Sequence, residues 1–338
     1  MSLNTSQMSE TLRHNSIDLR NRRILLTSFL GSEQERDLTD PSNCNGVGRI
    51  HHFRRNATPG WPADPLPMDP AAFKLGLPYE DLLLAQVFQN ACCNWRCWYC
   101  YVPYSLLQAD QSHSRWLSAS EIVDLYSKER NAPHLIDLSG GQPDLTPEWI
   151  PWMMRELMSR NLADQVYLWS DDNLSNDYFW RYLGRDDIAL VREYRNYGKV
   201  CCFKGFNPAS FAFNTRADPS LFAQQFKLFE RNLQLGIDIY GYSTFTTDTD
   251  SGLSHDISAF VDRLQSISVN LPLRVIPLEI RPYSPAKQRM RPGHEHALRL
   301  QWHAISAWKS ELEHRFSLAM RSLPIHEIPI RYERHDIR

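Results

Sequence analysis

The pattern of hydrophobic and polar residues divides the chain into a poorly periodic N-terminal part and a longer part with clear alternation. Over residues 1–78, neither helical spacing nor strand alternation persists, and the prolines of residues 58–70 indicate an extended segment. From about residue 79, apolar runs alternate with amphipathic stretches. We therefore predict a partly disordered, irregular N-terminal arm (1–78), a core domain (79–290), and a C-terminal helix and tail (291–338).

Six apolar runs in the core predict strands, and an amphipathic stretch that predicts helix follows each of them. The expected strands are residues 82–91, 134–140, 165–171, 199–206, 237–247 and 273–283. The expected helices are residues 120–131, 147–161, 178–197, 220–236, 255–267 and 295–316. Helix-end signals are a capping box of Ser118 with Glu121, a cap at Thr146 and a terminating Gly236.

Repeated strand–helix units favour a parallel sheet. A complete TIM barrel has eight such units, so six predict an α/β fold of the partial (β/α)6 TIM-like barrel type. Ligands of such a sheet are expected at the carboxyl ends of its strands. The loops that follow the predicted strands are therefore where we look for chemistry.

Composition narrows the setting of this chemistry. The chain has 338 residues, is 42% hydrophobic and carries a formal net charge of -2, so it can bury a core without disulfides and is not generally basic. Residues 1–16 lack the apolar segment of a secretory leader, and no apolar run reaches the roughly 20 residues of a membrane span. We expect a cytoplasmic protein without a membrane partner, in which clustered cysteines indicate metal or redox chemistry.

Four of the seven cysteines lie in the stretch CCNWRCWYC, directly after the first predicted strand. Three of them, Cys93, Cys97 and Cys100, have the spacing C-x3-C-x2-C. Thiolates are the ligands of iron–sulfur clusters, and three protein ligands leave one iron open for chemistry. A zinc site is the alternative, with Cys92 or a distant histidine as fourth ligand. We interpret Cys92 itself as a small buried residue at the end of the strand.

The stretch CNWRCWYC resembles the signature loop of the radical S-adenosylmethionine (radical SAM) superfamily. In that family an aromatic residue usually precedes the last cysteine, and here it is Tyr99. The stretch SGGQP (139–143) resembles the GGEP motif of the same family, with Gln142 in place of the usual glutamate. Backbone groups of that motif bind the amino group of SAM, so the replacement leaves their role intact. The resemblance covers residues 82–283.

The resemblance implies a mechanism. The three cysteines would hold a [4Fe–4S] cluster whose fourth iron chelates SAM, and reductive cleavage would give a 5′-deoxyadenosyl radical that abstracts hydrogen from a substrate. It also implies an electron donor such as flavodoxin or ferredoxin. Candidate SAM-binding residues are Tyr99, Ser139, Gly140, Gly141, Gln142, Ser170, Asp171, Lys204 and Arg281.

Simpler interpretations of these residues stay open. Paired glycines also form ordinary turns, an acidic pair such as Asp171 and Asp172 also begins helices, and Lys204 or Arg281 could be solvated charges. The substrate remains open between a small molecule, a nucleotide and a protein. Two alternative functions are an activase that generates a glycyl radical on a partner enzyme, and a zinc-stabilised nucleic-acid binder that uses the basic stretch GRIHHFRRN (48–56).

Overall fold

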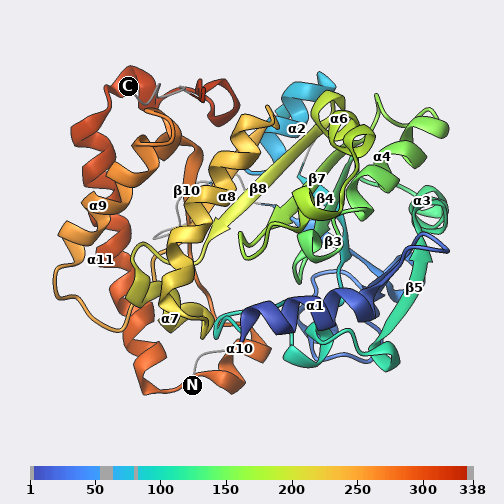
Figure 1. Ribbon diagram of the computed structural model, residues 1–338, viewed down its shortest axis with the longest axis horizontal. Coiled ribbons are helices and arrows are strands. Elements are labelled where there is room, and N and C mark those ends of the chain that lie inside the picture. Colours follow the sequence, from blue (N-terminus) through green and yellow to red (C-terminus); the bar gives the residue numbers. More distant parts are fainter. Residues whose placement is uncertain (1–3, 54–63, 80–82, 333–338) are drawn as a thin grey trace.

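The computed structural model describes residues 4–53, 64–79 and 83–332 and centres on a seven-stranded sheet (Figure 1). The strands of this sheet are β3 (Gly48–His52), β4 (Leu84–Gln89), β6 (Leu135–Ser139), β7 (Tyr167–Asp172), β8 (Tyr197–Phe203), β9 (Ile239–Thr244) and β10 (Val275–Leu278). Their spatial order is β10-β9-β8-β7-β6-β4-β3. From β4 to β10 all neighbours are parallel and follow chain order, whereas β3 pairs antiparallel with β4.

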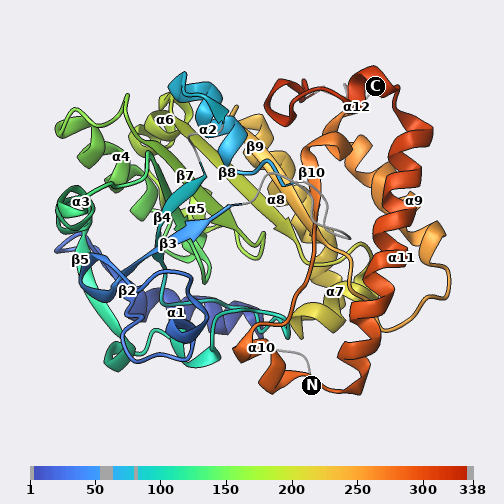
Figure 2. The ribbon, with the colours of Figure 1, turned by 180° about the vertical axis from the view of Figure 1, so that it is seen from behind.

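Helices connect these parallel strands, as predicted. They are α3 (Ala119–Lys128), α4 (Trp149–Ser159), α5 (Tyr178–Tyr182), α6 (Arg185–Glu193), α7 (Pro208–Thr215), α8 (Phe222–Gln234) and α9 (Leu253–Gln265), followed by α10 (Ser284–Arg289), α11 (Pro292–Arg315) and α12 (Leu318–Arg321). The long helix α11 packs along α9 at one end of the molecule, while α3, α4 and α6 lie at the other end (Figures 1 and 2). None of the described helices combines the length and the apolar character that crossing a membrane requires.

Two of the three predicted helix-end signals are confirmed and one is wrong. The Ser118–Glu121 capping box is confirmed at the start of α3, and Gly236 lies just beyond α8 with a left-handed φ of 77°. The cap at Thr146 is wrong: its hydroxyl donates to the Pro143 carbonyl, and α4 begins only at Trp149. The expected helix 178–197 is two helices, because Gly184 is extended between α5 and α6.

The N-terminal region is more regular than predicted. It contains α1 (Thr5–Ser16), α2 (Met68–Leu75) and the strands β1 (Ile17–Asp18) and β2 (Arg23–Thr27), which form a small antiparallel sheet with β5 (Ser114–Ser118). Strand β3 extends the main sheet. The prediction of an irregular arm was therefore wrong for these residues. The predicted disorder at residues 1–3 and the first part of the proline-rich segment (58–63) lie outside the described residues.

The two faces of the main sheet have different cores. On one face, residues such as Ile136, Leu138 and Leu168 pack in a cluster with α3 and α4, and further along the sheet the apolar layer continues beneath α8, α9 and α11. On the opposite face, called here the inner face, a smaller cluster includes Val87 and Trp169 together with the first turns of α2. Alternating side chains of one strand reach different faces, and polar residues gather on the inner face toward the carboxyl ends of the strands.

Candidate functional site

The cysteine-bearing loop leaves the carboxyl end of β4 and is fixed against the last turn of α7. The backbone amide of Arg96 donates to the Thr215 carbonyl (3.2 Å), and that of Trp98 donates to the Asn214 carbonyl (3.2 Å). The indole Nε1 of Trp98 also donates to Asn214 Oδ1 (3.1 Å). These bonds connect the loop to the segment after β8, so its position depends on the parallel sheet rather than on the loop alone.

The three cysteines of the predicted motif lie together in this loop. Cys93 and Cys97 are buried, Cys100 is partly exposed, and none forms a disulfide. The pKa of the Cys97 thiol is raised to about 12, mainly by burial and to a smaller extent by Cys93 and Cys100, while Lys204 opposes the rise. Burial and Cys93 also raise the pKa of Cys100. Cys93 therefore lies close enough to raise the pKa of both Cys97 and Cys100.

Cys92 has a different environment from its three neighbours. Its Sγ lies 3.3 Å from Ser16 Oγ on α1 and donates to Asn90 Oδ1 (3.0 Å). It is completely buried, in a cluster with Leu12, Leu25 and Leu145. This packing agrees with the prediction that Cys92 is a buried residue rather than a ligand.

The glycine pair after β6 approaches the cysteine loop at backbone distance. The Gln142 amide donates to the Cys92 carbonyl (2.7 Å). A Cβ on Gly141 would lie 2.3 Å from that same oxygen and 2.6 Å from the Asn90 carbonyl, and the φ of Gly141 is 63°. Only glycine fits this position without displacing the backbone. The pair is therefore more than an ordinary turn, because it seats one predicted motif against the other.

Gln142 shows why an amide can stand in this position. Its Nε2 donates to Asp172 Oδ1 (2.8 Å), and its Oε1 accepts from the Asn173 backbone amide (2.8 Å). Asp172 in turn faces the buried Lys199, which is 2.6 Å from Asp144. A glutamate at position 142 could not donate to Asp172, so the amide satisfies both groups.

Several predicted residues meet on the inner face beside the cysteines. Asp171 accepts a hydrogen bond from Ser139 Oγ (2.5 Å), and the Tyr99 hydroxyl pairs with Thr244 Oγ1 (2.9 Å). Burial alone would lower the pKa of Lys204, but the nearby Cys202, Tyr99 and cysteine thiols raise it well above its usual range. Lys204 is therefore a cation beside the cysteine loop rather than a solvated charge.

Two predicted residues are not brought to this place. Ser170 is on the opposite face of β7 from Asp171, where its Oγ pairs with the Tyr197 hydroxyl (2.7 Å). Arg281 follows β10 with its side chain more than half exposed, and its Nε donates to Glu279 (3.0 Å).

Polar residues support the cysteine loop. Asn173 was a candidate SAM contact because it follows the third predicted strand, whereas Ser9 and Arg289 were missed. Asn94 Nδ2 donates to Ser9 Oγ of α1 (2.9 Å), while its Oδ1 accepts from Asn173 Nδ2 (3.3 Å) and Ser175 Oγ. Asn173 Nδ2 also lies 3.6 Å from Cys93 Sγ, and its Oδ1 is buried without a partner. Arg289 of α10 donates to the Cys100 carbonyl.

Charged residues deeper on the inner face were also missed. Arg49 on β3 is 7% exposed and Asp137 on β6 is 8% exposed, although the basic stretch had suggested a surface patch. The remainder of that stretch, residues 54–56, lies outside the described residues. A charged residue inside an apolar strand run, such as Asp137 in LIDLS, could have been recognised from the sequence as a candidate buried functional residue.

The described residues contain no group of three or more His, Cys, Asp or Glu side chains that could hold one metal ion. The zinc alternative therefore has no geometric support among them. In a cubane cluster each protein thiolate binds a different iron, so its ligands need not converge on one point. Three neighbouring loop thiols, with a donor directed at the sulfur of Cys93, match the donor set of such a cluster, whose binding would displace the thiol protons.

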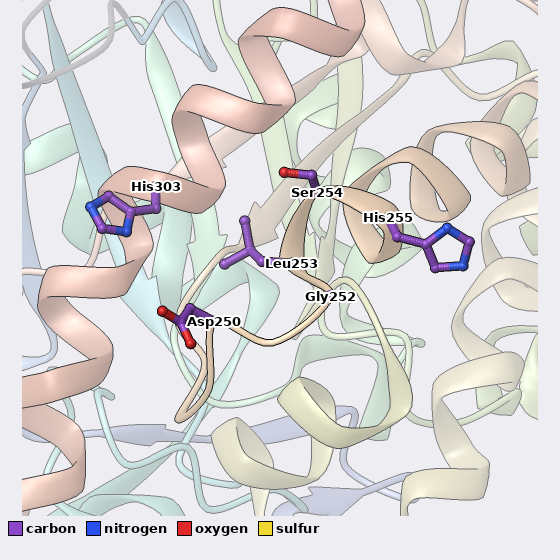
Figure 3. Close-up of a pocket in the computed structure, with 6 residues that line it drawn as sticks. All are labelled: Asp250, Gly252, Leu253, Ser254, His255 and His303. Atoms are coloured by element: carbon purple, nitrogen blue, oxygen red, sulfur yellow. The ribbon is translucent and has the colours of Figure 1, made fainter.

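A hollow of about 350 Å³ lies elsewhere, at the start of α9 and beside α11 (Figure 3). Its lining residues are Asp250, Gly252, Leu253, Ser254, His255 and His303. Figure 3 shows the imidazoles of His255 and His303 pointing in opposite directions, so these side chains do not converge on a common ligand. None of the cysteine-loop residues lines this hollow.

The comparisons with known proteins give structural likenesses only, because no family model and no curated protein matches the sequence. Streptococcus suis SuiB bound to S-adenosylmethionine aligns at 11% identity and a TM-score of 0.43, over 67% of this chain and 47% of SuiB. The protein anSMEcpe with bound AdoMet and the Kp18Cys peptide aligns at 12% identity and a TM-score of 0.41, over 59% of this chain and 51% of its own. Both structural neighbours are radical SAM enzymes.

The chain thus spans about half the length of these solved structures. At such scores the likeness carries no argument about chemistry.

Proposed function

We propose that this protein is a radical SAM enzyme in which Cys93, Cys97 and Cys100 hold a [4Fe–4S] cluster. The observation that carries the proposal is the direct backbone bond from Gln142 to Cys92, which seats the Gly-Gly turn after β6 against the cysteine loop after β4. Two motifs distant in sequence thereby meet at the carboxyl edge of the parallel sheet, where α/β folds bind ligands.

When bound, the cluster would supply the electron that cleaves SAM to methionine and a 5′-deoxyadenosyl radical. The chain's residues would orient the reactants and keep water out. Gly140 and Gly141 would present backbone groups to the SAM methionine, and Lys204 would offer a cation beside the cysteines. Tyr99, fixed through Thr244, would border the adenosine. The aromatic residues Trp95 and Trp98 are buried and would exclude solvent from the loop.

The finer architecture belongs to the same proposal. We infer that the consecutive parallel order β4-β6-β7-β8-β9-β10 is that of a partial (β/α)6 barrel, with the core domain at residues 79–290. The N-terminal region would close one side of it, since Ser9 and Ser16 of α1 contact the cysteine loop. An electron donor such as flavodoxin or ferredoxin would deliver the electron. The substrate would be a small molecule, a nucleotide or a protein.

The test begins with anaerobic reconstitution of the full chain. We expect about four irons and four sulfides per chain, an electron paramagnetic resonance signal after reduction with dithionite, and formation of 5′-deoxyadenosine from SAM. Cys97→Ala should lose iron and cleavage together, whereas Cys92→Ala is the matched control within the same loop and should keep both. A colourless wild-type protein with stoichiometric zinc, or a Cys97→Ala variant that still cleaves SAM, would refute the proposal.

A further inference from the structure

Two buried aspartates lie on the inner face in a setting that the cluster does not explain. Asp137 on β6 and Asp171 on β7 occupy neighbouring parallel strands, and their side chains point to the same face. Asp137 Oδ1 is buried without a hydrogen-bond partner. Burial raises the pKa of Asp137 well above its usual range, and the nearby Asp171 raises it further. A buried, unpartnered carboxylate of this kind is costly unless something pairs with it.

The protein's own cations are directed elsewhere. Arg49 is near enough to lower the pKa of Asp137, but its NH1 pairs with His51 Nδ1 (3.0 Å) and its NH2 donates to the Tyr101 hydroxyl (3.3 Å). Lys204 lies among the cysteine thiols, and Lys204 and Arg49 are near enough to lower the pKa of Asp171 without an ion pair to it. Within the described part of the chain, neither Asp137 nor Asp171 takes part in an ion pair. The carboxylates of Asp137 and Asp171 therefore lack a cationic partner in direct contact among the described residues, and a ligand could provide one.

Aromatic side chains surround the same position. Trp169 is the register partner of Asp137 on the adjacent strand, and the Tyr101 hydroxyl accepts a hydrogen bond from Arg49 NH2 on the neighbouring strand β3 (3.3 Å). Tyr242 lies further along this face, with its hydroxyl on the Asp64 carboxylate (2.9 Å). Carboxylates beside aromatic rings suit an organic cation, which gains from both. A bare metal ion would require more oxygen ligands.

We propose that Asp137 and Asp171 bind a positively charged ammonium or guanidinium group of the substrate. This inference rests on the proposed function and narrows its substrate class. Asp171 bonds to Ser139 at the carboxyl end of β6, so a group held between the aspartates would lie toward the edge of the sheet from which the cysteine loop leaves β4. Ser139 would keep the Asp171 carboxylate oriented.

The experiment measures binding to the reconstituted enzyme in the presence of SAM by isothermal titration calorimetry. The probes are two matched pairs: Nα-acetyl-lysine amide against Nα-acetyl-norleucine amide, and Nα-acetyl-arginine amide against Nα-acetyl-citrulline amide. We expect at least one cationic probe to bind at least tenfold more tightly than its neutral match. Asp137→Asn should abolish this preference. Asp250→Asn, in the distant hollow beside α9, removes a carboxylate elsewhere and should preserve it.

Four results would overturn the inference. The first is equal binding of the cationic and neutral probes within both pairs, and the second is a preference for the cationic probe that survives in Asp137→Asn. The third is a preference that is lost in KCl but kept in N-methylglucamine chloride. The fourth is a loss of SAM affinity in Asp137→Asn that parallels the loss of the preference. The third would assign the site to a monovalent metal ion and the fourth to SAM itself. An enzyme that cleaves SAM without the preference refutes only this inference. A protein that shows the preference but forms no cluster refutes only the proposed function.

Discussion

The main sheet has two buried charge clusters on its opposite faces, which share only strand β7 and are built differently. On the helix-covered face, Lys199 lies 2.6 Å from Asp144 and 3.8 Å from Asp172, with all three side chains almost completely buried. On the inner face, Asp137 and Asp171 lack such a contact, and Arg49 bonds to His51 and Tyr101 instead. The first cluster contains its own counterion, whereas the second leaves negative charge exposed to a ligand.

This difference indicates separate roles for chemically similar residues. The Lys199 cluster lies behind the Gly-Gly turn, where Gln142 connects it to the turn through Asp172. One oxygen, Asp144 Oδ1, has no partner even there, yet a cation in contact offsets most of the cost of burial. We interpret the Lys199 cluster as structural and the Asp137–Asp171 cluster as a binding element. The predictions below test that distinction.

The largest effect is expected from Lys199→Met. Removing the ammonium leaves Asp144 and Asp172 buried without a counterion, and breaking a buried pair in this way costs about 3–5 kcal/mol of the free energy of unfolding. Urea denaturation measures the loss. Lys227→Met, on the exposed side of α8, is the matched control and should change stability by less than about 0.5 kcal/mol. A loss for Lys199→Met no larger than the control's would contradict a structural role.

Gln142→Glu should have the next largest effect. The new carboxylate would lose the hydrogen bond to Asp172 and repel it, for a destabilisation of about 2 kcal/mol at neutral pH. The folded-state pKa of that glutamate would be raised, so the folded protein would bind its proton more tightly than the unfolded chain. Stability relative to wild type should therefore recover as the pH falls toward about 5. Denaturation midpoints at several pH values measure this, and a deficit independent of pH would exclude charge repulsion as its cause.

Asp137→Asn should act in the opposite direction and stabilise the ligand-free protein. The folded-state pKa of Asp137 is raised above the reference value of 3.8. Its burial therefore costs nothing below pH 3.8, costs progressively more as the pH rises through the folded-state pKa, and costs the full amount above it. The amide escapes this cost, so the variant should be more stable than wild type at pH 8.

Urea denaturation of Asp137→Asn at pH 8 and near pH 4 measures this gain, which should shrink at the lower pH. Asp250→Asn should show neither the gain nor its pH dependence. A destabilised Asp137→Asn would mean that the carboxylate already has a stabilising partner in the ligand-free protein, and the contrast between the two clusters would fail.

Much of the fold followed from the hydrophobic pattern. All six predicted strands occur, and their parallel order confirms the α/β class, because apolar runs bounded by turns mark strands buried on both faces. The boundaries were less predictable: the last strand is only Val275–Leu278, since Pro282 and the polar residues beyond it leave the sheet. The partial barrel and the domain limits remain predictions.

Helix α1 shows why the N-terminal region escaped prediction. Its buried residues are Thr5, Ser9, Leu12, Arg13 and Ser16, which follow helical spacing. Only Leu12 is apolar, so a search for hydrophobic periodicity finds nothing there. The polar residues are buried because they bond to groups far along the chain: Ser9 to Asn94, and Arg13 to Glu148 (2.9 Å). A sequence pattern contains no record of such distant partners.

The candidate site, like the fold, could be predicted from the sequence only in part. Local motifs identified the cysteines and the Gly-Gly turn, and the structure brings both to the same edge of the sheet. The position of Ser170 on the other face depended on strand register, because a shift of one residue exchanges the two faces. Ligation by the three cysteines and SAM binding by the other residues remain predictions, except that we propose a substrate cation instead of SAM as the partner of Asp171.

The smallest effect is expected from a substitution of Asn173, which directly follows β7 and contacts both the Gly-Gly turn and the cysteine loop. Its backbone amide bonds to Gln142 and its Nδ2 approaches Cys93 Sγ at 3.6 Å. Hydrogen bonds to cluster sulfurs stabilise the reduced state and raise the reduction potential. A bond worth about 1 kcal/mol corresponds to roughly 40 mV for one electron. Asn173→Leu should therefore lower the potential of the reconstituted cluster by about that amount.

Potentiometric titration followed by electron paramagnetic resonance measures the shift without any substrate. Asn270→Leu, which removes an exposed amide bonded to the Pro329 carbonyl, controls for general effects and should leave the potential unchanged. An unchanged potential in Asn173→Leu with normal iron content would show that the amide supports the loop only through Asn94. A lowered potential would show instead that Asn173, beside the charge clusters at the end of β7, raises the reduction potential of the cluster held by the cysteine loop.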